Sequence, residues 1–253
     1  TGSTPNFCVQ GVTLGTTTTL TATVSSTQFT GSTATLAVVP TGFVVGWPNG
    51  VNFSTTTLSP DTGFTVYTEQ LDPTTLAYAG GLGQAVRAGV TISVPVVSSD
   101  PSVGSITVSP VVLTAGMGSA STAFHPMSNG TTVLSVQTPA GYATQTSNPY
   151  SYYYSLTATA TVSAATSQIN GIGGPIGQDL QYCGVNVSLS NTPSTPVTVT
   201  VDTGGSTGVL LSASPTTVGG GTLTFTNVTG STPNFCVQGV TLGTTTTLTA
   251  TVS

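Results

Sequence analysis

Alternation of apolar and hydroxyl-bearing residues is the dominant pattern along the chain. Runs of this kind span residues 156–162, 183–190, 197–201, 222–226 and 247–252. Side chains on a β-strand point to alternate faces, so each run has one apolar face and one hydroxyl face. Threonine suits the exposed face because its β-branched side chain fits a pleated surface. The pattern predicts half-buried strands.

Turn signals separate these runs. They lie at Pro48-Asn49-Gly50, at 60–63 (PDTG), at Gly80-Gly81, at Gly204-Gly205 and at 219–221 (GGG). Short strands that alternate with turns are typical of antiparallel sandwiches. The sequence shows no convincing helical periodicity, and we therefore predict an all-β fold made of antiparallel β-sandwich domains.

An internal repeat sets the domain organisation. Residues 1–25 and 229–253 are identical, letter for letter, at an offset of 228 residues. This period is much longer than a solenoid unit, so each repeat should contain whole domains, and two sandwiches of roughly 100 residues would fill it. We expect residues 1–25 to be the tail of a preceding copy, followed by one domain at 26–150 and another at 151–253. The chain would then be a window of a longer array.

Charge is nearly absent. Only 3% of the 253 residues are charged, Arg87 is the only cationic side chain apart from the single histidine, and 55 Thr and 29 Ser make up about a third of the chain. One arginine cannot neutralise a nucleic-acid backbone or hold the chain on an anionic membrane, which excludes both partners. The 37% hydrophobic content also argues against disorder. We expect a secreted or cell-surface protein.

Two segments carry a family resemblance. Residues 98–121 (SSDPSVGSITVSPVVLTAGMGSAS) and 208–230 (GVLLSASPTTVGGGTLTFTNVTG) resemble bacterial Ig-like repeat modules, and VTLGTTTTLTATVS is similar to the last strand of such a module. The resemblance implies tandem Ig-like β-sandwiches in a large secreted or surface-attached protein. The acidic clusters that hold calcium in many long adhesins are missing from this sequence.

The cysteines fit the same resemblance. Cys183 and Cys236 are 53 residues apart in the C-terminal domain, and Cys8 is the repeat equivalent of Cys236. An Ig-like sandwich in an oxidising compartment would join an early and a late strand through such a pair. Alternation places Cys183 on the apolar face with Val185, whereas Cys236 has the opposite parity to its apolar neighbours. A bulge, or a strand buried on both faces, would resolve this; two unpaired buried thiols are the alternative.

Aromatic residues supply a candidate contact surface. Tyr150, Tyr152, Tyr153 and Tyr154 cluster near the predicted domain boundary, and Trp47 adjoins a turn signal. Aromatic side chains are enriched at interfaces. The tyrosines can be read either as an exposed partner-binding patch or, as we favour, as packing between domains. We interpret Trp47 as a loop anchor rather than a sugar-binding platform.

Catalytic and metal-binding chemistry find no support in the sequence. His125 is the only histidine, its nearest acid along the chain is Asp100, and no catalytic motif surrounds it. The six acidic residues are scattered, so no calcium or zinc ligand set is present. We predict that the protein is not an enzyme and requires no cofactor or metal.

Several functions remain compatible with these features. The repeat and the lack of charge favour a structural module of an extracellular fibre, stalk or sheath, whose partners are identical repeats. A filament subunit that donates its 25-residue segment to a neighbour's sandwich is a variant of this hypothesis. An adhesin module is a further alternative. Ice binding is the weakest, because the threonine clusters at 16–19 and 244–247 are isolated.

Overall fold

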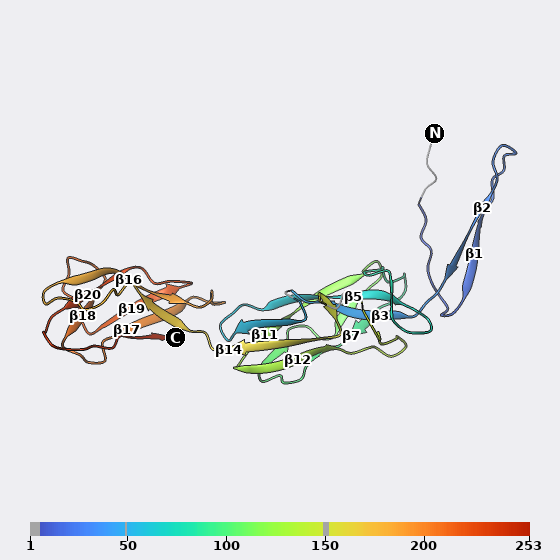
Figure 1. The fold of residues 1–253 in the computed structure, drawn as a ribbon. Coiled ribbons are helices and arrows are strands. Elements are labelled where there is room, and N and C mark those ends of the chain that lie inside the picture. The colour runs from blue at the N-terminus through green and yellow to red at the C-terminus, as the bar shows by residue number, and fades with distance from the viewer. Residues whose placement is uncertain (1–5, 49, 149–151) are drawn as a thin grey trace. The chain divides into compact units, whose positions relative to one another are not determined.

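The computed structural model describes residues 6–48, 50–148 and 152–253, and this part of the chain folds entirely into strands, turns and loops. Figure 1 shows arrows and no coiled ribbon along these residues. The strand pairs whose register is described are antiparallel. The predicted all-β sandwich fold is therefore confirmed.

The chain divides into two compact units. Unit 1 contains residues 1–54 and 61–161, and unit 2 contains residues 55–60 and 162–253. The predicted boundary near residue 150 lies outside the described residues. The chain beyond it still belongs to unit 1, because Tyr154 pairs with Gly46 of a central sheet and Val136 N–H donates to Leu156 C=O at 2.8 Å. Residues 1–25 are grouped with unit 1 as well.

Unit 1 contains two larger sheets and a short strand pair. One sheet has the order β13 (Tyr154–Ser155), β3 (Thr41–Gly46), β5 (Thr62–Leu71), β11 (Ser119–Pro126) and β9 (Gly104–Ile106), with β6 (Tyr78–Gly80) paired to β5. The other has the order β4 (Asn52–Thr56), β14 (Thr157–Ser163), β12 (Gly130–Val136) and β8 (Val96–Ser98). The strand pair is β7 (Ile92–Val94) with β10 (Val111–Leu113).

Aromatic rings and aliphatic side chains fill the core of unit 1. Phe53 of β4 meets Phe124 of β11 edge to face at 5.7 Å between ring centroids, which brings side chains of the two larger sheets into contact. Ala158 and Ala160 of β14 are buried with them, as the alternation predicts. The aromatic pair adds stabilisation beyond its buried area.

Unit 2 is a sandwich of two sheets. One sheet has the order β15 (Ser167–Asn170), β16 (Gln181–Leu189), β20 (Phe235–Gly239) and β18 (Val209–Ser212). The other has the order β19 (Thr222–Val228), β17 (Val197–Asp202) and β21 (Thr249–Val252). The alternating valines of β16 and β17 form the shared core, because Val185, Val187, Val199 and Val201 are completely buried.

A loop that is distant in sequence completes unit 2. Residues 55–60 comprise the end of β4 and most of the loop that leads to β5, yet they are grouped with this unit. Leu58 packs against its core, and its carbonyl accepts a hydrogen bond from Ser194 N–H at 2.8 Å. The sequence carries no local sign of this contact, since it joins residues more than a hundred positions apart.

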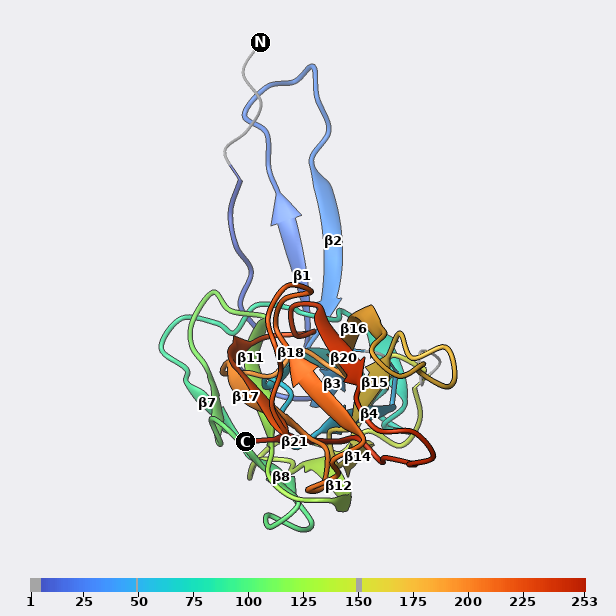
Figure 2. The same ribbon diagram turned by 90° about the vertical axis from the view of Figure 1, so that its left-hand side faces the viewer.

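The N-terminal part of the chain forms a hairpin. β1 (Thr17–Ala22) and β2 (Ser32–Ala37) pair antiparallel with Thr17 opposite Ala37 and Ala22 opposite Ser32. The two strands lie side by side in both views (Figures 1 and 2). Every residue of the hairpin strands is exposed except Leu20, which is half-buried. The hairpin therefore has strand pairing without a core beneath it.

One acidic side chain is buried in unit 1. Glu69 lies on β5 opposite Gly42 of β3, and only 1% of its surface is accessible. Gln145 Nε2 donates to Glu69 Oε2 at 3.3 Å, while Oε1 has no hydrogen-bond partner among the described residues. Burial removes water from the carboxylate, disfavours its charged form and raises its pKa from 4.5 to about 7.

This burial predicts a pH-dependent stability of unit 1. Because the folded-state pKa of Glu69 is raised, the folded unit binds a proton more tightly than the unfolded chain does. The contribution of Glu69 to the stability of unit 1 should be fully present below about pH 4.5 and should be lost, by roughly 3 kcal/mol, as the pH rises through 7. Urea unfolding at pH 5 to 8, followed through the fluorescence of the buried Trp47, measures this loss.

The variant Glu69→Gln should abolish the slope, because the amide has nearly the same shape and does not ionise. Asp179→Asn in unit 2 serves as the matched control and should leave the slope unchanged. A Glu69→Gln protein that keeps the wild-type slope between pH 5 and 8 would contradict this explanation.

Candidate functional site

The repeated segment is part of the core of unit 2 in its C-terminal copy. β20 is hydrogen-bonded on one side to β16 and on the other to β18. Phe235, Cys236 and Val237 at its start are each at most 2% exposed. The strand is thus buried on both faces at this point, which is one of the two arrangements expected from the parity of Cys236.

The N-terminal copy of the same letters has a different environment. Phe7 is 79% exposed and Val9 is 54% exposed, although their equivalents Phe235 and Val237 are almost completely buried. Cys8 is an exposed free thiol. Residues 6–12 form no strand here, whereas 235–239 form β20. The segment therefore adopts the core strand only where the remaining strands of a sandwich surround it.

Cys183 and Cys236 form a disulfide. The two residues lie directly opposite each other on β16 and β20, so the bridge joins neighbouring strands of one sheet. A bulge between Cys183 and Val185, with Gly184 at a φ of 94°, shifts the alternation of β16. Positive φ favours glycine because it has no Cβ. Cys183 is consequently exposed, and its predicted place on the apolar face with Val185 was wrong.

The aromatic cluster divides between the interior and the surface of unit 1. Trp47 is 3% exposed and packs on Phe64 with ring centroids 4.9 Å apart, so it is a core residue and offers no surface to a partner. Its predicted role as a contact residue was therefore wrong. The apolar run Phe43-Val44-Val45 precedes it, and its burial agrees with the interpretation of Trp47 as a loop anchor.

Of the four tyrosines, one packs against its own unit, two are exposed and one lies outside the described residues. Tyr154 is half-buried and meets Tyr67 edge to face at 5.7 Å, which places it against its own unit. Tyr152 and Tyr153 are 66% and 57% exposed, and their rings contact each other. Tyr150 lies outside the described residues. The assignment of the cluster to an inter-domain or partner contact stays a prediction for Tyr150, Tyr152 and Tyr153.

His125 has a partner that sequence proximity did not suggest. Its Nδ1 lies 2.7 Å from Asp61 Oδ1, and both side chains are about half exposed. The register of β11 and β5 explains the pair, because Phe124 opposes Thr62 and the next residues along therefore oppose each other. Asp100, the nearest acid in sequence, instead accepts hydrogen bonds from Ser102. These bonds hold the pKa of Asp100 below its usual range.

The described residues contain neither a metal-ligand cluster nor a membrane-spanning helix. No group of three or more His, Cys, Asp or Glu side chains comes together there to hold a metal ion. Nor does that part of the chain contain a helix long and apolar enough to cross a membrane.

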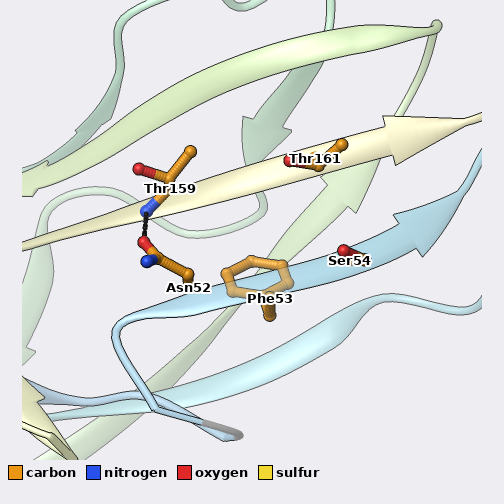
Figure 3. Close-up of a pocket in the computed structure, with 5 residues that line it drawn as sticks. All are labelled: Asn52, Phe53, Ser54, Thr159 and Thr161. Carbon is orange, nitrogen blue, oxygen red and sulfur yellow. Dashed lines mark hydrogen bonds between the residues drawn. The ribbon is translucent and has the colours of Figure 1, made fainter.

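A shallow depression lies beside β4 and β14 in unit 1. It is lined by Asn52, Phe53, Ser54, Thr159 and Thr161, and Asn52 Oδ1 accepts a hydrogen bond from Thr159 N–H at 3.3 Å (Figure 3). Its walls are hydroxyls, one amide and a ring that is 5% exposed. This lining contains no acid, base or thiol, so it provides no nucleophile or proton carrier other than weak hydroxyls.

Comparisons with known proteins give distant structural neighbours. No family model matches the chain, and no curated protein matches its sequence. Domains 4–9 of the surface layer protein SbsC align over 93% of this chain and 33% of that chain, at 13% identity and a TM-score of 0.32. Domains 4 and 5 of the same S-layer protein align over 83% and 92%, at 16% identity and a TM-score of 0.35.

CBD12 from CALX1.2 aligns over 83% of this chain and 79% of that chain, at 8% identity and a TM-score of 0.34. At scores this low the likeness carries no argument about fold or role. The fold assignment rests instead on the strand pairings described above, and the resemblance to bacterial Ig-like modules stays a prediction.

The disulfide generates a prediction about unit 2. In a Cys8→Ser background, Cys183→Ser should destabilise unit 2 by roughly 4 kcal/mol, because a bridge across 53 residues restricts the unfolded chain. Hydrogen exchange at the Val237 amide measures unit 2, while Trp47 fluorescence measures unit 1. Cys8→Ser alone is the control and should change neither. Equal loss in both units, or none in unit 2, would contradict this assignment.

Proposed function

We propose that this chain is a structural repeat module of an extracellular fibre, stalk or sheath, built from tandem β-sandwich domains with a period of 228 residues. Its partners are identical repeats that precede and follow it. Its role is mechanical rather than catalytic. Each repeat contributes folded sandwich domains to the array, and the repeated segment at its end completes the sandwich that precedes it along the chain.

The repeated segment in its two environments carries this proposal. Phe235 and Val237 are integral to the core of unit 2, and Phe7 and Val9 present the same apolar side chains to water. Exposing a phenylalanine and a valine forgoes roughly 1.5–3 kcal/mol each. In a tandem array, the strands of a preceding copy would surround residues 6–12 and recover this free energy.

The chemistry of the chain supports an extracellular setting. A disulfide such as Cys183–Cys236 persists in oxidising compartments and is rare in the cytosol. The near absence of charge, with a formal net charge of −5 over 253 residues, limits repulsion between laterally packed copies. Both features suit a protein that assembles outside the cell at high local concentration.

A donor-strand filament is the second candidate, and the same exposed segment favours it. Residues 6–24 of one subunit could fill the place that 234–252 occupy in another, with main-chain pairing across the joint. This arrangement displaces a segment that is already covalently attached to its own sandwich. The attached copy has the advantage of a high effective concentration, which favours the covalent array.

A two-period chain tests the proposal. Placing a copy of residues 26–228 ahead of residue 1 restores a complete sandwich before the N-terminal segment. Cys8 should then form a disulfide with the added copy of Cys183 and resist alkylation by iodoacetamide under native conditions. Disulfide mapping by mass spectrometry identifies the pair.

The original chain is the control, and its exposed Cys8 should be alkylated rapidly. The variant Phe7→Asp in the two-period chain should restore alkylation, because an aspartate cannot enter the site that Phe235 occupies. Leu14→Asp should not, because Leu14 and its equivalent Leu242 are both exposed in this turn. A two-period chain whose Cys8 reacts as fast as in the original chain would refute the proposal.

A further inference from the structure

The turn after the apolar strand is the same in both copies of the repeated segment. Gly15 and Gly243 have φ values of 76° and 73°. The hydroxyl of Thr16 donates to Thr13 C=O at 2.6 Å, and the hydroxyl of Thr244 donates to Thr241 C=O at 3.0 Å. The segment thus builds this turn from its own residues. The strand that follows the turn pairs with a different strand in each copy.

In unit 2 the last strand is hydrogen-bonded through one edge. Thr198 and Ser253 exchange both backbone hydrogen bonds, at 2.8 and 2.9 Å. Hydrogen-bonded and non-hydrogen-bonded pairs alternate along an antiparallel ladder. Thr251 and Thr249 therefore also point their N–H and C=O groups toward β17. Ala250 lies between them, and its N–H and C=O groups point toward the opposite edge of β21. No strand pairs with that edge among the described residues.

In the N-terminal copy the equivalent strand is hydrogen-bonded through the other edge. Val38 N–H donates to Thr16 C=O at 2.9 Å, which places the even-numbered residues of β1 in the hydrogen-bonded pairs. Ala22 therefore bonds to Ser32 of β2. Ala22 is the repeat equivalent of Ala250. The two pairings use opposite edges of one strand and can form at the same time.

We infer that residues 32–37 of the following copy pair with the open edge of β21 and extend the sheet β19-β17-β21 to four strands. The inference rests on the proposed tandem arrangement, in which Ser253 is followed by the equivalent of residue 26. It also explains a difference between the copies: residues 17–20 are strand where β2 pairs with them, and 245–248 are not strand where this partner is lacking.

The side chains of the added strand fit this position. Residues directly opposite each other in a ladder share a face. Leu20 opposes Ala34, so Ala34 of the following copy would lie beside Leu248, which packs on the core of unit 2. Leu36 would oppose the equivalent of Thr18, which is Thr246. Ala34 and Leu36 of β2 therefore face the sandwich, and its threonines face water.

A cavity in unit 2 lies where this apolar face would arrive. It has a volume of about 440 Å³ and is lined by Ile172, Ile176, Thr246 and Leu248, among others. Leu36 is 43% exposed in the hairpin, where it has no core to cover. Paired opposite Thr246, Leu36 of the following copy would enter this cavity and bury apolar surface on both sides.

The pairing should end near residue 37. Val38 lies against Gly11 in the hairpin, with its Cγ1 3.3 Å from the position that a Cβ of Gly11 would take. Beside the equivalent Gly239, the carbonyl of Gly177 already fills this space at 2.5 Å. Residues 38–40 of the following copy would therefore leave the edge and lead into its own β3.

Appending a second copy of residues 26–40 after Ser253 of the full chain tests this inference. The N–H groups of Leu248 and Ala250 should then donate to Ala34 and Ser32 of the appended copy. Their hydrogen exchange, followed by NMR, should slow at least tenfold relative to the original chain. Exchange at Thr251, which already faces β17, should change much less.

Two proline variants of the appended copy separate strand pairing from mere proximity. Ala34→Pro removes an N–H that would donate to Leu248 C=O and should abolish the slowing. Thr33→Pro removes an N–H that points away from β21 by the same alternation and should retain most of it. Unchanged exchange at Leu248 and Ala250 in the appended chain, or an equal loss with both variants, would overturn the inference.

A side-chain pair gives a second, independent readout. Leu36→Asp in the appended copy should abolish the slowing because it would place a charge beside Ile172, Ile176 and Leu248, while Thr35→Asp on the outer face should not. These outcomes are separable from those of the two-period chain. Protected Cys8 in that chain, together with unchanged exchange here, would leave the tandem arrangement standing and remove only the fourth strand.

Discussion

The insertion of β20 between β16 and β18 is the interaction on which unit 2 depends. It buries Phe235 and Val237, aligns Cys236 with Cys183 and covers the valines of the facing sheet. Residues 7–9 have the same sequence, but they have no neighbouring strands and form no strand themselves. Local sequence sets the turn at Gly15 and Gly243, and the neighbouring strands decide whether the segment before it becomes a core strand.

Hydroxyl groups make many of the polar contacts that ion pairs make in more charged proteins. The buried Thr122 hydroxyl donates to Val108 C=O at 2.9 Å and accepts from Val108 N–H at 3.1 Å. Thr232, also buried, accepts from Val187 N–H at 2.9 Å, and Thr68 donates to Gln84 C=O at 2.6 Å. Such bonds satisfy the backbone where strand pairing is interrupted. Threonine therefore serves on both faces of these sheets.

Local alternation was enough to predict the fold class and many core positions. Val185, Val187, Val199 and Val201 are buried as expected, because period 2 is a property of the strand itself. The repeat pointed to the segment that proves most informative. These successes depend only on neighbours in sequence or on identity between two stretches of sequence.

Features that depend on long-range pairing were not predictable. The parity of the cysteines allowed either a bulge or a strand buried on both faces, and only the register of β16 with β20 places a bulge at Gly184, where it turns Cys183 outward. Trp47 is buried because Phe64 packs on it, and His125 meets Asp61 because β11 pairs with β5. The open edge of β21 likewise becomes evident only when the two hydrogen-bond ladders are compared. The sequence pattern does not indicate it.

The size of the native protein tests the central claim most directly. Material taken from its source should be boiled in denaturant, with and without reductant, and separated on a denaturing gel. Covalent tandem repeats predict a chain much longer than one period of 228 residues that persists under both conditions. A band at a single period after boiling would contradict the array and would favour separate, strand-donating subunits instead.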